Sequence, residues 1–321
     1  TKKGKADRMR VHYSANLSLR LRPHYSNFNY MNSRERIQFS KEAYDAGARY
    51  QTEPLPQIYT YEGLMSMYND RLVTEDFFVQ QMELLETVNT DWLDILTHNA
   101  FSHNHNLSFS GGSEKMTYNV SFNYTSQKGF EIGNETERFT GRINLDTKLR
   151  KNVRANFTLY ASLDNSDGFG PGVNPMGYAT KTSRSIPAYN ADGSRTFYQT
   201  YEKYKYNGQQ QALSFNFENE RDNSYARNEA NYFDVSVNFD WDITSDFTYQ
   251  FVGDIMHSNN ESEAYAGEKT QYIARNYRGY DYGTESNDSE KYKASMLPFG
   301  GELLKTGNKL VSYNMQHKVL F

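Results

Sequence analysis

Residues 116–125, MTYNVSFNYT, alternate apolar and polar side chains without a break. A period of two is that of a β-strand, whose successive side chains point to opposite faces of a sheet. The apolar positions are Met116, Tyr118, Val120, Phe122 and Tyr124, and the polar positions run from Thr117 to Thr125. In a soluble sandwich such an apolar face meets another sheet, whereas in a membrane barrel it meets lipid and the polar face lines the lumen. The stretch therefore narrows the fold to two all-β classes.

The same alternation recurs along the chain and predicts about eight strands. The further alternating stretches cover residues 11–21, 139–149, 153–163, 233–243, 247–255 and 309–321. The connections fall into two classes: tight turns at 150–152 and 244–246, and long polar excursions at about 22–102, 164–229 and 258–306. Short turns at one end of the strands and long loops at the other are typical of an outer-membrane barrel. We therefore expect an antiparallel transmembrane β-barrel.

The first long excursion carries helix signals. Asn32 followed by Glu35 predicts a capping box, and Gly47 predicts the end of that helix. A second helix is expected after Thr74, with an apolar face over residues 78–85. We expect both helices to pack on the rim of the barrel.

Composition excludes several classes of protein. Aromatic residues reach 15% of the 321 residues, which favours β structure. The mean hydropathy of -0.86 is that of strands with one polar face. No apolar run approaches the roughly 18 residues of a membrane helix. A net charge of -4 gives no basic field for nucleic acid, and the absence of cysteine removes disulfides and thiolate metal sites.

No motif predicts catalysis, a cofactor or a metal site. His98, His103 and His105 lie close together, but no cysteine or paired carboxylate is placed to complete a metal shell, so they are interpreted as polar residues near a loop. Neither G-x-S-x-G nor H-E-x-x-H occurs, which points away from an enzyme. The glycine- and proline-rich stretch 168–175 is expected to be an irregular loop with no helix after it.

The third excursion interleaves tyrosines with charged residues. Rigid aromatic faces beside hydrogen-bonding groups suit the recognition of a sugar, a peptide or a partner protein. Tyr277, Tyr280 and Tyr282 are the candidate contacts. Packing of the tyrosines on one another is the equally weighted alternative.

Three stretches resemble one family. TKKGKADRMRVHYSANLSL (1–19) resembles the junction of plug and barrel in SusC/RagA-type TonB-dependent transporters of the Bacteroidetes outer membrane. Residues 89–148, with NTDW, then NHNLSFSGG, a tyrosine-containing strand and FTGRINL, are similar to a characteristic stretch of that family. NPMGYATKTSRSIPAYNADGS (174–194) is similar to the loop that follows in one branch of it.

This resemblance implies a barrel of 22 strands filled by a plug, covered by a SusD-like surface lipoprotein and energised through TonB. Residues 1–321 would form part of the single barrel domain, without the plug and the C-terminal strands. The implied activity is active import of an oligosaccharide or a peptide through a multi-pass barrel in contact with outer-membrane lipid.

Two other classes remain open from the residues. A soluble or surface-attached β-sandwich that binds carbohydrate would bury the apolar faces in a dry core. A β-rich glycoside hydrolase would need two carboxylates about 5 to 10 Å apart in a cleft. Alternation accounts for the candidate acids Asp234, Asp240 and Asp242 as one polar strand face.

Overall fold

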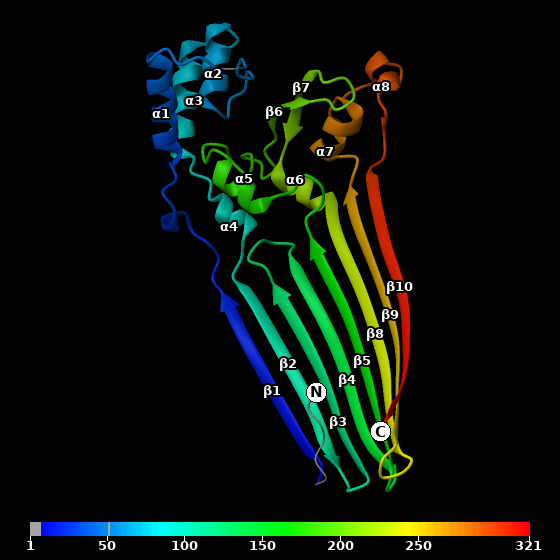
Figure 1. The fold of residues 1–321 in the computed structure, drawn as a ribbon. Coiled ribbons are helices and arrows are strands. Elements are labelled where there is room, and N and C mark those ends of the chain that lie inside the picture. Colours follow the sequence, from blue (N-terminus) through cyan, green and yellow to red (C-terminus); the bar gives the residue numbers. More distant parts are fainter. Residues whose placement is uncertain (1–7, 51) are drawn as a thin grey trace.

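A tall antiparallel sheet of eight strands dominates the computed structural model, which describes residues 8–50 and 52–321 (Figure 1). Its strands are β1 (Arg10–Arg20), β2 (Ala100–Gly112), β3 (Met116–Lys128), β4 (Glu135–Arg150), β5 (Val153–Gly168), β8 (Ser224–Asp242), β9 (Thr248–Ala266) and β10 (Glu302–Leu320). They pair in the order β1-β2-β3-β4-β5-β8-β9-β10, so each strand of this sheet lies beside the sheet's next strand in chain order. This is the topology of an up-and-down barrel wall.

The connections sort by length to the two ends of the sheet. Residues 113–115, 151–152 and 243–247 make the tight turns at the lower end in Figure 1. Residues 21–99, 169–223 and 267–301 make the long connections at the upper end, beside the shorter 129–134. The predicted asymmetry of the loops is therefore present.

The strands run further into the loops than the hydropathy pattern indicates. β5 extends to Gly168 and β8 starts at Ser224, while β9 extends to Ala266 and β10 starts at Glu302. In these extensions the side chains no longer divide into one apolar and one polar face, so hydropathy no longer alternates although the backbone ladder continues.

The long connections contain the helices and a small hairpin. Residues 21–99 hold η1 (Tyr25–Asn27), α1 (Ser33–Asp45), α2 (Tyr61–Asn69), α3 (Glu75–Thr87) and α4 (Trp92–Leu96). Residues 169–223 hold α5 (Pro175–Lys181), the hairpin β6 (Tyr198–Lys203) and β7 (Gln210–Phe215), and α6 (Phe217–Asp222). Residues 267–301 hold α7 (Gln271–Ile273), a π-helical turn η2 (Ala274–Arg278) and α8 (Glu290–Ala294). Within residues 8–50 and 52–321, no helix is both long and apolar enough to cross a membrane.

The predicted helix starts are confirmed. Asn32 and Glu35 form the reciprocal capping box of α1, with hydrogen bonds of 3.0 and 2.9 Å, and Gly47 adopts a φ of +75° just after that helix. Thr74 caps α3 through the backbone N–H of Phe77. Helices α1–α3 form a separate helical module, whose core is Ile37, Tyr61, Leu64 and Leu85 with Phe78, Met65 and Met82 packed against it.

One helix contradicts the prediction for residues 168–175. α5 begins at Pro175, and Asn174 caps it by accepting from the backbone N–H of Gly177 at 2.8 Å. Proline is tolerated in the first turn because its missing N–H has no partner there in any helix.

Candidate functional site

The apolar face of the eight-stranded sheet is exposed along all its strands. The backbone register aligns one row of it: Val11, Phe109, Val120, Ile143, Leu159, Val235, Ile255 and Tyr313. Val11, Ile143 and Ile255 are 56%, 40% and 53% exposed. Among the described residues no second sheet covers this face, so the sandwich alternative loses the dry core that it requires. The predicted alternation from Met116 to Thr125 is confirmed, with Met116 and Phe122 on the exposed apolar face.

The apolar face forms a band that is oblique to the strands. Val11 on β1 and Tyr313 on β10 share a row. Exposed apolar residues continue ten residues above this row to Leu21, just past the end of β1, but only two residues above it on β10, to Val311. The upper edge of the band thus drops eight residues over the seven steps between these strands. With about 3.3 Å per residue and about 4.8 Å per strand, the strands tilt about 38° from the normal of the band. Strands of membrane barrels tilt about 35–45° from the bilayer normal.

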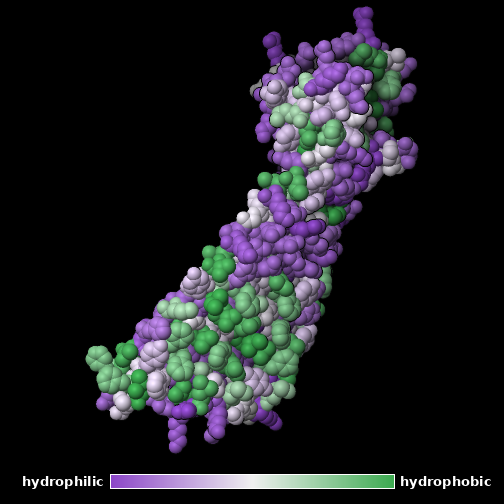
Figure 2. Space-filling model, turned by 90° about the vertical axis from the view of Figure 1, so that its right-hand side faces the viewer, coloured by the Kyte–Doolittle hydropathy of each residue, from purple (hydrophilic) through white to green (hydrophobic). Residues whose placement is uncertain are grey.

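Charged side chains replace the apolar ones above the band. Lys128 pairs with Glu135 at 3.5 Å, Arg227 pairs with Asp167 at 3.0 Å, and Lys305 bridges two glutamates on β9. Figure 2 shows this change on one face of the molecule, where hydrophobic side chains gather over the lower part of the strands and a hydrophilic zone lies above them. The upper ends of the strands therefore have the surface of a segment in water.

On the opposite, polar face of the sheet, side-chain hydrogen bonds link neighbouring strands. Asn104 donates to Asn123 at 2.8 Å, and Thr158 donates to Asn144 at 3.1 Å. Arg138 on β4 pairs with Asp164 on β5. Amides and hydroxyls bonded across strands make a wettable wall, as the lumen of a large barrel requires.

Above the strands, a loop core joins the first and second long connections. Trp92, Leu93, Leu96, Ala179, Ile186, Ala188 and Phe217 are its buried members. Trp92 packs edge-on against Tyr178 with ring centroids 5.0 Å apart, and its indole N–H donates to Ser183 O at 3.2 Å. An antiparallel bridge from Thr97 to Glu131 ties the end of α4 to the connection between β3 and β4. These loops form one packed assembly over the end of the sheet.

A buried carboxylate fastens the third long connection to the second. Glu220, at 3% exposure, accepts from the backbone N–H groups of Gln271 at 2.7 Å and Tyr272 at 3.4 Å, the first two residues of α7. Burial raises the pKa of Glu220 above its ordinary value, while these hydrogen bonds oppose the rise. The Gln271 side chain then donates to Thr200 Oγ1 and Leu213 O in the β6–β7 hairpin.

The three candidate tyrosines lie in the third connection, in different environments. Tyr277 donates its hydroxyl to Glu302 at the start of β10, and this hydrogen bond, with burial, raises its pKa to about 12. Tyr280 is buried. Tyr282 is 44% exposed, and its hydrogen bond to Glu268 raises its pKa. Tyr277 is therefore held by its hydrogen bond to Glu302, Tyr280 is packed inside the connection, and Tyr282 keeps an exposed surface.

Arg278 holds this connection together from inside. It is 2% exposed, lies 5.1 Å from the ring centroid of Tyr282, and donates to Glu268 O at 2.9 Å. Burial lowers the pKa of its guanidinium. Gly279 follows with a φ of +84°, and a Cβ there would lie 3.1 Å from the Tyr204 ring, so glycine suits both backbone and packing.

Two of the three histidines are neighbours on β2, and the third precedes that strand. His103 and His105 lie on the apolar face of β2 with ring centroids 5.1 Å apart, and Tyr13 bonds to His105 Nδ1 at 2.7 Å. His98 precedes β2, where its backbone N–H donates to Phe130 O. In the described part of the chain, no group of three or more histidines and carboxylates is arranged to hold a metal ion.

Known proteins share both sequence and fold with this chain. TonB-dependent receptor P26 of Formosa agariphila is 34% identical over 109 residues, which are 33% of this chain and 10% of that protein. TonB-dependent receptor SusC of Bacteroides thetaiotaomicron is 36% identical over 78 residues, which are 23% of this chain and 8% of that protein. The RagAB peptide importer in its closed-closed state matches 99% of this chain and 33% of its own with a TM-score of 0.64 at 17% identity. The similarity to SusC/RagA-type TonB-dependent transporters is confirmed.

The chain spans about a third of the length of the RagAB chain, and its matched segment covers about a tenth of receptor P26. No family model matches the chain. The open-open state of the RagAB importer gives nearly the same fold match, with a TM-score of 0.62. The fold match therefore covers both the strands and the long connections of this chain.

Proposed function

We propose that residues 1–321 belong to the barrel domain of an outer-membrane transporter that imports a nutrient with energy delivered through TonB. The observation that carries this proposal is the oblique apolar band, because its tilt of about 38° agrees with that of strands in a bilayer while the reverse face is polar. In this proposal the apolar face contacts lipid and the polar face borders the path of the nutrient. Transport makes or breaks no bond in the cargo.

The long connections support an extracellular partner. All of them leave the sheet at its upper end, and the loop core and Glu220 fix them to one another. The helical module projects beyond them and exposes aromatic side chains, among them Phe39 at 52% and Tyr44 at 39%. A fixed platform with exposed aromatics suits docking of a SusD-like lipoprotein. The RagAB structures are described as those of a peptide importer, so a peptide is one candidate cargo class. An oligosaccharide is the other candidate class.

The test uses the full-length protein in the bacterium that encodes it. We expect it in the outer-membrane fraction, together with a lipoprotein that copurifies in mild detergent. Uptake of its nutrient should stop both when its gene is deleted and when TonB is depleted, and restoring either should restore uptake. Recovery in the soluble fraction without a partner, or uptake that persists without TonB, would reject the proposal.

A further inference from the structure

A hollow of about 470 Å³ lies on the polar face near the upper ends of β4, β5, β8, β9 and β10. One register row of it consists of small hydrogen-bonding side chains: Thr136, Ser166, Asn228, Ser262 and Thr306. The next row towards the loops consists of Gly168, Ala226, Ala264 and Leu304. We call this pair of rows the hydroxyl trough. Across five strands it extends about 19 Å, from four spacings of about 4.8 Å.

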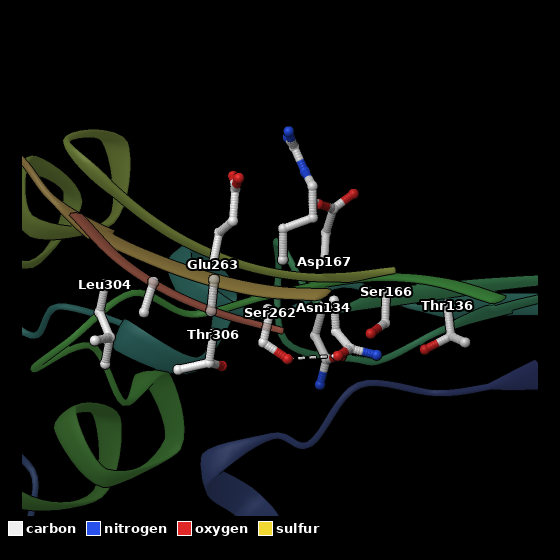
Figure 3. A pocket seen from close by; sticks show the side chains of 13 residues that line it. Asn134, Thr136, Ser166, Asp167, Ser262, Glu263, Leu304 and Thr306 are labelled. Carbon is white, nitrogen blue, oxygen red and sulfur yellow. Dashed lines mark hydrogen bonds and ion pairs between the residues drawn. The ribbon is translucent and has the colours of Figure 1, made fainter. Parts of the chain in front are cut away.

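Neither row of the trough contains a charged residue, although Asp167, Arg227 and Glu263 also line the hollow from the other side of the strands. Figure 3 shows Glu263 and Asp167 on one side of the strands, and Ser262, Thr306 and Thr136 on the other. Asp167 is neutralised there by Arg227 at 3.0 Å. One row below the trough the polar face again carries charge, in the ion pair of Arg138 and Asp164. The uncharged zone is therefore confined to the two rows of the trough.

Its hydroxyl groups are available to a ligand. Within the described residues, the hydroxyls of Thr136, Ser166 and Thr306 make no hydrogen bond to protein. Ser262 donates to Asn228 Oδ1 at 2.6 Å, which leaves the two amide hydrogens of Asn228 free to donate. A hydroxyl both donates and accepts, so this row matches a ligand whose own groups do the same.

The second row adds a flat apolar strip. Gly168, Ala226 and Ala264 keep the surface close to the backbone, and Leu304 stands out from it at 59% exposure. A Cβ built on Gly168 meets no atom within 4 Å, so the hollow is open at that point. Hydroxyls beside small apolar side chains offer a sugar ring partners for its hydroxyls and a contact for its C–H face.

A peptide fits this surface less well. Peptides that bind to sheets do so chiefly through their main chain at an exposed edge. Here β4, β5, β8 and β9 are paired on both sides, so their backbone groups are used in the ladder. The trough also has no charge to meet ionised termini or side chains.

We propose that the hydroxyl trough binds an uncharged oligosaccharide during import, so that the cargo of the proposed transporter is a neutral glycan. The assignment rests on the proposed function. It predicts that binding depends on hydroxyls of the trough and is blocked by bulk placed inside it.

The test uses the detergent-solubilised full-length transporter with its copurified lipoprotein. The probes are maltohexaose, xylohexaose and mannohexaose as neutral glycans, hexagalacturonate as an anionic one, and a hexapeptide, with binding measured by native mass spectrometry. We expect at least one neutral hexasaccharide to bind. The triple variant Thr136→Val, Ser166→Ala, Thr306→Val should lose about tenfold or more in affinity, because each lost hydrogen bond is modest and three add up.

Two further variants guard against misfolding. Gly168→Trp fills the open hollow and should abolish binding while the protein still reaches the outer membrane. Asn165→Ala changes an exposed neighbour of Ser166 on the opposite face of β5 and should bind as the wild type does. If no neutral hexasaccharide binds, or if the triple variant and Gly168→Trp both bind it with wild-type affinity, the proposal that the trough binds a neutral glycan is rejected. TonB-dependent uptake of an anionic glycan or a peptide would do the same while leaving the transport function intact.

Discussion

Glu220 accepts a hydrogen bond of 2.7 Å from the backbone N–H of Gln271, although 51 residues separate them. The carboxylate stands at the N-terminal end of α7, where backbone N–H groups lack partners within the helix. It belongs to α6, so one side chain joins the second long connection to the third. The junction links the segment just before β8 to the segment just after β9.

Glu220→Ala should loosen this junction. It leaves the buried N–H of Gln271 and the part-buried N–H of Tyr272 without an acceptor, at a local cost of roughly 1–3 kcal/mol for a buried unsatisfied group. Hydrogen exchange of residues 270–273 should accelerate accordingly in the detergent-solubilised full-length protein. Glu220→Gln retains one acceptor oxygen and should keep most of the protection. Equal exchange in the alanine variant and the wild type would show that the junction is not stabilising.

The junction should also depend on pH. Burial raises the pKa of Glu220 in the folded protein above its unfolded value, so folding favours the protonated form. The resulting stabilisation is fully present below the unfolded pKa and is lost as pH rises through the folded pKa. After correction for intrinsic exchange, protection of residues 270–273 should fall in the wild type as pH rises from 4 to 8. Glu220→Gln should lack that fall, and parallel profiles would contradict the assignment.

Trp92→Ala should destabilise the packing of the loop core. The indole is 3% exposed among Leu96, Ala179 and Phe217, and truncating a buried tryptophan costs roughly 3–5 kcal/mol. Limited proteolysis of intact cells should then cut within residues 169–223 much faster than in the wild type. Phe197→Ala, at an aromatic that is 46% exposed in the same connection, is the control and should leave the rate unchanged.

Local signals in the sequence were sufficient for the strands, the turns and two helix starts. Alternation identifies a strand wherever one face is apolar, and Asn32 and Thr74 cap α1 and α3 through bonds within four residues. Alternation failed above the apolar band, where residues 164–168 remain paired with β8 although both of their faces are polar. The prediction of an irregular loop at Pro175 was wrong, because proline is tolerated at the first position of a helix, where an N–H would have no partner.

The candidate site was less predictable because tertiary contacts create it. No pattern in the sequence predicts the hydrogen bond between Glu220 and Gln271. Each row of the hydroxyl trough takes one residue from each strand that it crosses, so no single stretch of sequence displays it. The tyrosines of the third connection were visible in the sequence, but only their packing separates the buried Tyr280 from the exposed Tyr282.

Substitution of Tyr277 should affect stability, whereas substitution of Tyr282 should affect binding. Tyr277→Phe removes the hydroxyl that donates to Glu302 and should destabilise the third connection by roughly 1.5–3 kcal/mol, as expected for a bond to a charged group. Its effect should be visible as faster hydrogen exchange of residues 274–278. Tyr282→Ala removes a half-exposed ring and should alter lipoprotein or cargo affinity with a smaller change in exchange. Wild-type affinities in Tyr282→Ala would remove this residue from the candidate contacts.

Adjacent residues on β3 should respond oppositely to the same charge. Phe122 is 39% exposed on the apolar face, and Ser121 lies beside it on the polar face. A lysine on the lipid face of a barrel costs about 2–4 kcal/mol at mid-bilayer, whereas a lysine in a wet lumen retains its hydration. Phe122→Lys in the full-length protein should therefore reduce the folded, heat-modifiable form in the outer membrane, and Ser121→Lys should not. The reverse order would place lipid on the polar face, and equal tolerance would mean that neither face contacts lipid.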